Sequence, residues 1–410
     1  MPTTAAIDSR RAWVMAGAAL AILTIAHGAP MISAVALKPI AAEFGTSRGA
    51  PAAAGSFVYV GAAVGGILAG TLSGRFGFRP MVLFGAVMVA LGLAVSSRGG
   101  LTNLYLGHGV LIGLFGTSCM LSPLITYVSL WFERRRGAAV ALISAGQSIA
   151  GMVWPLLFDA GISHYGWRVM MEIYAAFVVV VIALLATIFL QQPPKISAVS
   201  PGATTSVART DRLGLPPNLM MALLMAAVFC CCVPMNMPMQ HIVAFCGDLG
   251  IGSRQGAAML SLLLGTAFVA RQLWGWVADK VGGLQTLVWS SLVQALALSA
   301  FLLTQDEWRL FVISSVFGLG LSGLLPAYVI TVREYYPASE ANWRVPTVLF
   351  AGYLGMAAGG WGAGALYDHF GFYAPAFAVG IVFNLVNLLV LGWLVSRELR
   401  NDIDPKVVAA

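Results

Sequence analysis

Long apolar stretches alternate with short polar ones along almost the whole chain. About 20 apolar residues in a helix span the hydrocarbon core of a bilayer, and twelve stretches reach about that length. They lie at about 13–36, 52–72, 80–97, 103–130, 138–158, 169–190, 218–243, 256–276, 284–303, 309–331, 346–366 and 375–395. No polar segment between them is long enough to form a soluble domain with its own core. The pattern predicts an all-α membrane protein with 12 transmembrane helices.

Composition supports this prediction. Hydrophobic residues make up 59% of the chain and charged residues only 10%, whereas a soluble domain averages about 25% charged residues. The mean hydropathy is +0.85. Residues 1–11 are polar, and the apolar run after them is too long for the core of a signal peptide, so we expect it to remain as the first span. The five cysteines have neither disulfide nor zinc spacing, so we expect no metal and no cofactor.

The charges predict an orientation. With both termini in the cytoplasm, sixteen lysines and arginines fall in cytoplasmic segments and six on the opposite face. This asymmetry follows the positive-inside rule and accounts for the net charge of +7 without a nucleic-acid partner. The expected location is the cell membrane, with several passes, and specifically a bacterial inner membrane. The one remaining cation is Arg271, which lies within a predicted span.

Three loop motifs recur at an offset of about 205 residues. The pairs begin at Gly70 and Gly275, at His164 and His369, and at Glu43 and Asp248. Each pair follows equivalent spans, so six helices are followed by six of the same topology. We therefore predict a six-helix half at 1–190, a cytoplasmic linker rich in Pro, Ser and Thr at 191–217, and a second half with a short cytoplasmic tail at 218–410. Two such halves around a central site are typical of one large transporter class.

Arg271 is the residue that the sequence singles out. A charge at the centre of a bilayer costs at least a few kcal/mol and is kept mainly where it faces a polar cavity or binds something. No carboxylate stands one turn away on its own helix, where the neighbours are Ala267, Phe268, Trp274 and Gly275. We expect Arg271 to bind a small organic anion. The alternative is an arginine that extends to the inner face or pairs with a distant helix.

The two loops that begin at Gly70 and Gly275 resemble the signature loop of the major facilitator superfamily. Its pattern is a glycine, three residues, an acid, a base, one residue and a glycine. The second copy fits fully, and the first has Gly74 where the acid is usual. In that family the loop helps to gate the two transport states. The resemblance implies gating roles for Gly70, Arg75, Gly77, Arg79, Gly275, Asp279, Lys280 and Gly282.

Further motifs resemble the bacterial monocarboxylate porters and the oxalate–formate antiporters of that superfamily. They lie at Leu37–Lys38–Pro39, Glu43–Phe44–Gly45, Trp131 to Gly137, Gly166–Trp167–Arg168, Val269–Ala270–Arg271 and Gly371–Phe372–Tyr373. The resemblance covers about residues 25–395. It implies the two-half fold with alternating access and places Arg271 where that branch binds the substrate carboxylate. The planar guanidinium also matches a carboxylate.

The chain departs from its relatives at charged positions. Met31 and Ala267 stand where animal monocarboxylate carriers have a lysine and an aspartate, so their proton relay cannot be transferred. Residues 346–366 lack the second base that the oxalate exchangers use. A single cavity cation favours a single carboxylate over oxalate.

Other membrane-embedded polar residues are candidates for the cavity lining. Asn236 and Gln240 lie one turn apart near Pro234 and Pro238, and a broken helix often lines a transporter site. The further candidate hydrogen-bond donors to the substrate are Tyr59, Gln147, Tyr328 and Tyr353. His27, His108 and His241 are candidates for proton coupling, since histidine titrates near neutral pH. For each of these residues a role in packing is an alternative.

The predicted function is secondary active transport of a small monocarboxylate, such as lactate, pyruvate or a short hydroxy or keto acid, by proton symport. The protein is expected to be a monomer and not an enzyme, because no P-loop, GxSxG or HExxH motif is present. An oxalate–formate type of anion exchanger is the nearest alternative. A multidrug or other organic-solute exporter is less favoured, because no buried acid is found at mid-depth.

Overall fold

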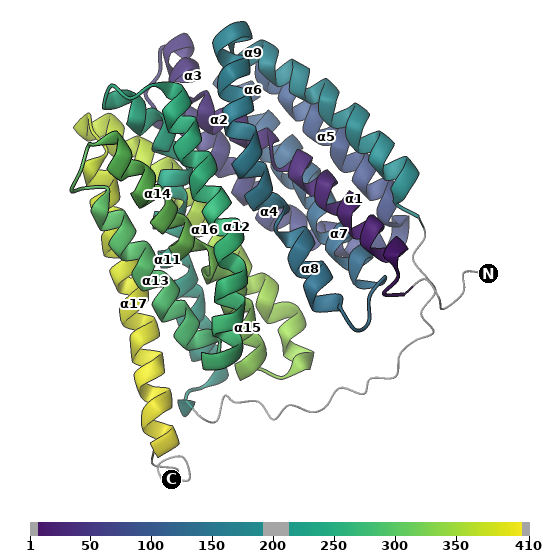
Figure 1. Cartoon of the computed structure of the whole chain (residues 1–410), viewed down its shortest axis with the longest axis vertical. Coiled ribbons are helices and arrows are strands. Elements are labelled where there is room, and N and C mark those ends of the chain that lie inside the picture. Colours follow the sequence, from purple (N-terminus) through teal and green to yellow (C-terminus); the bar gives the residue numbers. More distant parts are fainter. Residues whose placement is uncertain (1–6, 192–212, 404–410) are drawn as a thin grey trace. The chain divides into compact units, whose positions relative to one another are not determined.

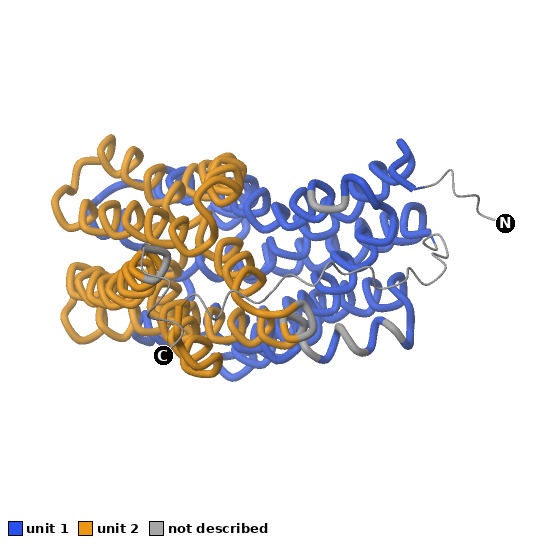
Figure 2. Tube along the Cα trace, turned by 90° about the horizontal axis from the view of Figure 1, so that it is seen from below, with its two compact units in different colours: residues 1–200, 243–261 blue, residues 201–242, 262–410 orange. Residues whose placement is uncertain are grey.

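The computed structural model describes residues 7–191 and 213–403, which form helices joined by short turns (Figure 1). No strand occurs in these described ranges. The chain divides into two compact units (Figure 2). Unit 1 comprises Met1–Ser200 and Val243–Ser261, and unit 2 comprises Pro201–Ile242 and Leu262–Ala410. The predicted linker lies mostly at 192–212, outside the described residues, and the predicted division into two halves stays a prediction.

The described residues of unit 1 form ten helices that belong to it alone. They are α1 (Arg10–Ala26), α2 (Ala29–Val35), α3 (Leu37–Phe44), α4 (Gly49–Phe76), α5 (Phe78–Arg98), α6 (Leu101–Tyr105), the π-helical η2 (Leu106–Thr117), α7 (Ser118–Ser129), α8 (Arg136–Ser144) and α9 (Gly146–Phe189). Within α9 the backbone is not helical at Gly166, where φ is 77°. Two predicted spans therefore meet end to end at this glycine.

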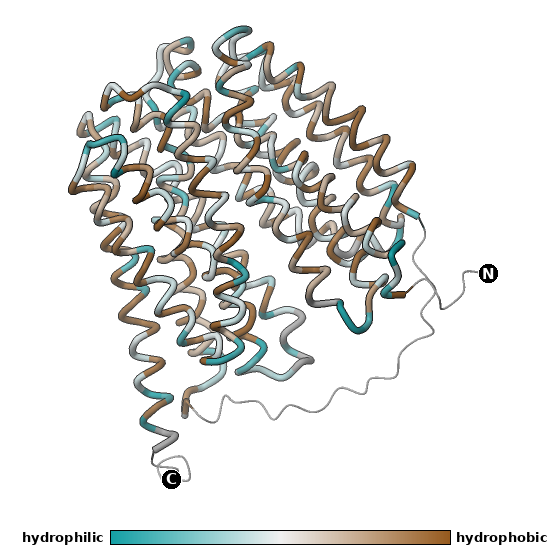
Figure 3. The backbone as a smooth tube through the Cα atoms, viewed as in Figure 1, coloured by the Kyte–Doolittle hydropathy of each residue, from teal (hydrophilic) through white to brown (hydrophobic). Residues whose placement is uncertain are grey.

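The remaining helices of the described ranges belong to unit 2 or cross its boundary. They are α11 (Pro217–Asp248), α12 (Ser253–Val281), α13 (Gly283–Ala300), α14 (Glu307–Ser322), α15 (Leu324–Tyr335), α16 (Ala338–Phe370) and α17 (Ala374–Ile403). The C-terminal end of α11 and the N-terminal end of α12 lie in unit 1. Hydropathy follows the helices, with apolar residues along them and polar ones gathered where helices end, as in the loop before α8 (Figure 3).

Eight helical stretches in the described part of the chain are long and apolar enough to cross a membrane. One of them, Ala138–Phe189, contains the two predicted spans that meet at Gly166. The predicted spans at 52–72, 284–303 and 346–366 coincide with α4, α13 and α16. The predicted all-helical fold is therefore confirmed for the described residues, whereas the number of crossings and the side on which each terminus lies stay predictions.

Glycines with positive φ repeat at the predicted period. Gly45 and Gly250 have φ of 59° and 77°, Gly77 and Gly282 have 82° and 84°, and Gly166 and Gly371 have 77° and 82°. In each pair the members are 205 residues apart. Glycine tolerates this left-handed conformation without steric cost, so the same turns are built at the same places in both repeats.

The first helix of unit 1 is broken between α1 and α2, and α9 stabilises the break. Pro30 has no N–H to continue the ladder, and Gly28 donates to the carbonyl of Ile25 at 3.1 Å. The indole of Trp154 donates to the carbonyl of Thr24 at 2.9 Å, and the hydroxyl of Tyr174 donates to that of Ile25 at 2.7 Å. Buried carbonyls need such partners, so these two side chains keep the break in one conformation.

The basic loop before α8 is fixed by Asp8. Its carboxylate accepts hydrogen bonds from the backbone N–H groups of Glu133, Arg134 and Arg135 at 3.3, 3.0 and 3.3 Å. These bonds, the one from Arg134 above all, lower the pKa of Asp8 below its usual value. The N-terminal segment thereby holds a loop that the sequence marks only as a basic turn.

Candidate functional site

Arg271 lies in α12 and is partly exposed. Two hydrogen bonds fix this helix against α14: Thr266 donates to the carbonyl of Ser315 at 3.1 Å, and the indole of Trp274 donates to that of Leu319 at 2.7 Å. At about 100° per residue, Arg271 lies roughly a quarter turn away from the face that carries these contacts. The helix is therefore held in a defined rotation, in which position 271 lies off the face that contacts α14.

Asn236 and Gln240 of α11 differ in their contacts within unit 2. Asn236 donates from Nδ2 to the carbonyl of Met356 at 2.8 Å. Gln240 is 6% exposed, and its Nε2 has no hydrogen-bond partner among the described residues. A buried amide donor without a partner is costly. Of this pair, Gln240 is therefore the residue whose amide donor stays unsatisfied among the described residues.

The three histidines differ in their surroundings. His241 is fully buried between the hydroxyl of Tyr373, 3.0 Å from Nδ1, and the carbonyl of Gly360, 2.7 Å from Nε2. His108 lies in η2 with Nδ1 3.0 Å from Ser96 Oγ, while its buried Nε2 has no partner among the described residues. In His27, Nδ1 is 2.8 Å from the carbonyl of Leu23. A proton-coupling role stays a prediction for all three, and the contacts of His241 favour packing.

Tyr328 belongs to a buried chain of hydrogen bonds that sequence reasoning missed. Its hydroxyl donates to Asn387 at 2.9 Å, Asn387 donates to Ser291 at 2.6 Å, and Ser291 donates to Asn384 at 2.9 Å. Asn384 then donates to Gln294 at 2.7 Å, and Gln294 donates to the carbonyl of Cys231 at 3.4 Å. This chain, which we call the Tyr328–Cys231 network, joins α15, α17, α13 and α11. The hydroxyl of Tyr328 is thus engaged within the protein.

Replacing Tyr328 with phenylalanine is expected to lower stability rather than affinity. The change removes the donor to Asn387 inside the protein, where an unsatisfied polar group costs about 1–3 kcal/mol. We expect a lower melting temperature in detergent and an unchanged KM for the substrate. Tyr165→Phe, at a tyrosine that is 63% exposed, is the control and should leave the melting temperature unchanged. A raised KM with normal stability would instead indicate a contact with substrate.

The remaining candidates are partly exposed side chains in different units. Tyr59 of α4 and Gln147 of α9 belong to unit 1, and Tyr353 of α16 belongs to unit 2. Their substrate contacts stay predictions. No group of three metal-ligating side chains occurs in the part of the chain that the structure describes.

The two loops that resemble the signature loop share a backbone but differ in charge. Gly77 and Gly282 end α4 and α12 with φ of 82° and 84°, and each donates its N–H to the carbonyl four residues earlier. Lys280 lies with Nζ 3.6 Å from the ring centroid of Trp276. Glu334 of α15 accepts from the N–H of Gly283 at 3.0 Å and anchors the second loop. No motif or spacing in the sequence singles out Glu334.

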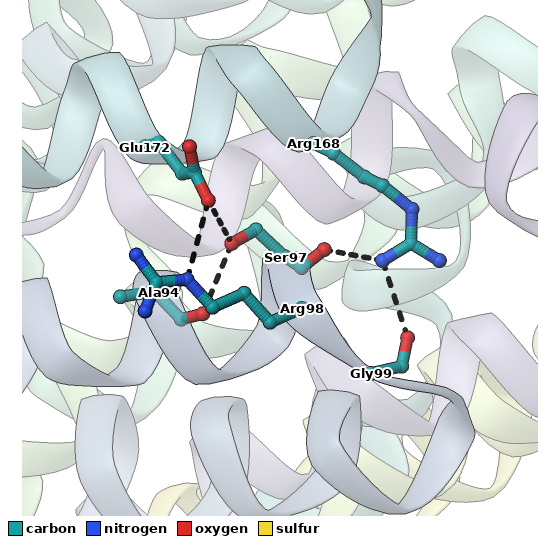
Figure 4. Close-up of polar contacts among 6 residues, drawn as sticks. All are labelled: Ala94, Ser97, Arg98, Gly99, Arg168 and Glu172. Atoms are coloured by element: carbon teal, nitrogen blue, oxygen red, sulfur yellow. Dashed lines mark hydrogen bonds and ion pairs between the residues drawn. The ribbon is translucent and has the colours of Figure 1, made fainter.

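Arg168 joins two of the quoted motifs in unit 1. Its Nε donates to Glu43 Oε1 at 2.6 Å, and the indole of Trp167 donates to Glu43 Oε2 at 2.5 Å. Arg168 also donates from Nη1 to the carbonyls of Ser97 and Gly99, beside the contacts of Glu172 with Ser97 and Arg98 (Figure 4). The first loop motif and the Gly–Trp–Arg motif therefore form one polar cluster.

Asp248 is the repeat equivalent of Glu43. It forms ion pairs with Arg48 and Lys38. Both Nη atoms of Arg48 donate to its carboxylate, and Lys38 Nζ lies 2.9 Å from Oδ1. Lys38 also lines a cavity of about 380 Å³ together with Asp159, Trp167 and Ser253. The end of α11 is therefore fixed in unit 1 by two cations on one acid.

Asp248→Asn should loosen this end of the unit. Cys246, two residues away, is fully buried. With the other four cysteines replaced by alanine, the labelling rate of Cys246 reports how often this segment opens. Partly exposed ion pairs contribute about 1 kcal/mol or less each, so we expect maleimide labelling of Cys246 to become severalfold faster. Glu307→Gln, at an exposed acid in the first turn of α14, is the control. Equal labelling rates in both variants would contradict a fixing role for Asp248.

Comparison with known proteins identifies the family to which this chain belongs. The sequence model of the Major Facilitator Superfamily matches residues 14–305 and 242–408. The chain belongs to the Major Facilitator Superfamily. As a member of this superfamily it is a multi-pass membrane transporter and not an enzyme.

Several relatives of this superfamily member share most of its length. It is 28% identical over 361 residues to monocarboxylate transporter 13 of Bos taurus, covering 85% of this chain and 82% of the relative. It is 26% identical over 405 residues to monocarboxylate transporter 11 of Homo sapiens, covering 96% and 78%. The resemblance to the monocarboxylate branch of the Major Facilitator Superfamily is thereby confirmed.

A solved structure supports the superfamily fold. A bacterial homologue of the human lysosomal transporter Spinster, crystallised in an inward-facing and occupied conformation, matches with a TM-score of 0.64. The match covers 97% of this chain and 96% of that protein at 15% identity. At this identity the match shows the Major Facilitator fold alone.

Proposed function

We propose that this protein is a secondary active transporter of a small monocarboxylate, such as lactate, pyruvate or a short hydroxy or keto acid. The observation that carries the proposal is Arg271, a cation within the apolar stretch Ser253–Val281. It occupies the place at which the resemblance implies a carboxylate-binding arginine. The names of the relatives at 26–28% identity point to the same class of substrate. The proposal includes a monomer in a bacterial inner membrane.

Alternating access with proton symport is the proposed mechanism. The guanidinium of Arg271 binds the carboxylate through two parallel hydrogen bonds, and the unsatisfied amide of Gln240 is available to the hydroxyl or keto oxygen of the substrate. Moving an anion with a proton is electrically neutral and avoids about 2.3 kcal/mol per charge for each 100 mV of membrane potential. The loops around Gly77 and Gly282 gate the two states in this proposal.

Uptake into proteoliposomes tests the proposal. Radiolabelled lactate, pyruvate, oxalate and formate are supplied outside, with and without an inward proton gradient. Symport predicts that accumulation of a monocarboxylate rises severalfold with the gradient and needs no internal anion. Strong stimulation by internal anion with little response to pH would instead identify an exchanger of the oxalate–formate type. No uptake of any carboxylate would contradict the substrate class.

A further inference from the structure

An apolar groove runs along the surface of unit 1 between α4, α5 and the continuous η2–α7 helix. Its volume is about 360 Å³. The floor is formed by Ala69, Met81 and Cys119, which are 0%, 5% and 4% exposed and contact one another. The walls are large apolar side chains that are each more than a third exposed: Leu68, Leu72, Phe76, Phe84 and Phe115. The groove therefore has a closed apolar floor and apolar edges that face outward.

The length of the groove matches one leaflet of a bilayer. It extends along α4 from Gly65 to Phe76, which at 1.5 Å per residue is about 16 Å. Half of the hydrocarbon core is about 15 Å. Phe84 and Phe115 pack edge to face at one end, with ring centroids 6.2 Å apart. A single extended acyl chain fits these dimensions.

The other end of the groove meets a basic loop. Arg75 and Arg79 flank the turn at Gly77, next to the lining residues Phe76 and Pro80, and both are exposed. Neither forms an ion pair with another described residue. Gly74 stands at the position that Asp279 occupies in the second repeat, so the loop has two cations and no acid. The positive-inside rule places it on the cytoplasmic face, where anionic lipids attract lysine and arginine.

We infer that this groove binds an anionic phospholipid of the inner leaflet, with an acyl chain over Ala69 and Met81 and the phosphate against Arg75 and Arg79. The occupant is argued from the length of the groove and the charge at its end. The inference does not rest on the proposed transport function. The missing acid at Gly74 then has a physical consequence, since a carboxylate there would repel the phosphate.

Native mass spectrometry of the purified full-length protein tests this inference. Phosphatidylglycerol and phosphatidylcholine with the same long acyl chains are titrated separately. We expect phosphatidylglycerol to bind more tightly, and R75Q together with R79Q to weaken its binding about 25-fold, at about fivefold for each cation near the membrane surface. Arg333→Gln, at an exposed arginine in the last turn of α15, is the control and should leave binding unchanged.

The acyl chain has its own test. Ala69→Phe fills the floor of the groove and should weaken long-chain phosphatidylglycerol severalfold, and Phe84→Ser at the exposed wall serves if the first variant does not fold. Dihexanoyl phosphatidylglycerol should bind more weakly than the long-chain lipid. Equal affinity for the two headgroups would overturn the inference. Binding unaffected by the groove variants, or a second copy of the chain bound in place of lipid, would overturn it as well.

Discussion

Replacing Arg271 with alanine is expected to reduce kcat/KM for uptake about 100-fold or more. Hydrogen bonds to charged groups contribute about 1.5–3 kcal/mol each, and the alanine variant loses the two that the proposed carboxylate contact provides. Arg271→Lys keeps the charge but not the planar fork, so we expect a loss of about tenfold, mainly in KM. The measurement is initial uptake of lactate and pyruvate into proteoliposomes over a range of substrate concentrations.

The control for Arg271 is another arginine of the same unit. Arg309 is exposed. Its side chain forms no ion pair with another described residue. Arg309→Ala should leave uptake unchanged at equal protein content. If the Arg271→Ala variant is folded, fully incorporated into the proteoliposomes and transports normally, Arg271 is not the carboxylate-binding residue. The proposed binding site would then be wrong.

Substituting Gly359 is expected to disrupt unit 2. A Cβ at this position of α16 would lie 2.0 Å from the backbone carbonyl oxygen of Val233 in α11. Backbone cannot rotate away as a side chain does, so the helices would have to separate. Overpacking of this kind costs about 1–3 kcal/mol for a single methyl group and more for a larger side chain. We expect Gly359→Ala to lower the melting temperature and Gly359→Val to prevent recovery of folded protein.

The same helix provides a matched control. A Cβ at Gly362, one turn further along α16, would meet nothing within 4 Å. Gly362→Ala should leave the melting temperature unchanged or raise it slightly, because alanine favours a helix over glycine by about 1 kcal/mol. A similar fall in both variants would mean that the contact between α11 and α16 does not explain the effect of Gly359.

Much of the fold follows from local patterns in the sequence. The apolar stretches predicted the helices, because a segment buried in lipid must satisfy its own backbone hydrogen bonds. The repeat predicted the paired turns, since Gly45, Gly77 and Gly166 adopt a positive φ that depends on the local sequence alone. The break between α1 and α2 was not predicted, although Gly28 and Pro30 mark it, because its stabilisation depends on side chains from α9.

The partners of polar residues were much harder to predict. Glu43 and Asp248 are equivalent in the repeat, yet Glu43 binds Arg168 and Asp248 binds Arg48 and Lys38. Spacing within a helix or loop identifies the residue, but the partner comes from a distant segment. Tyr328 shows the same limit, since its depth in the membrane made it a candidate donor to substrate but did not predict that its hydroxyl donates to Asn387. Asn236 and His241 likewise have partners on other helices, whereas the Nε2 of Gln240 has none among the described residues.

The Tyr328–Cys231 network has a consequence for how the protein is made. Its four helices enter the bilayer in the order α11, α13, α15 and α17, and the last of them supplies both Asn384 and Asn387. Until α17 is inserted, the hydroxyl of Ser291 and the Oε1 of Gln294 in α13 lack the partners that Asn384 and Asn387 supply, and unpaired polar groups within hydrocarbon are costly. A nascent chain therefore remains a target for cellular quality control until α17 is inserted. We expect chains that end before residue 374 to be degraded.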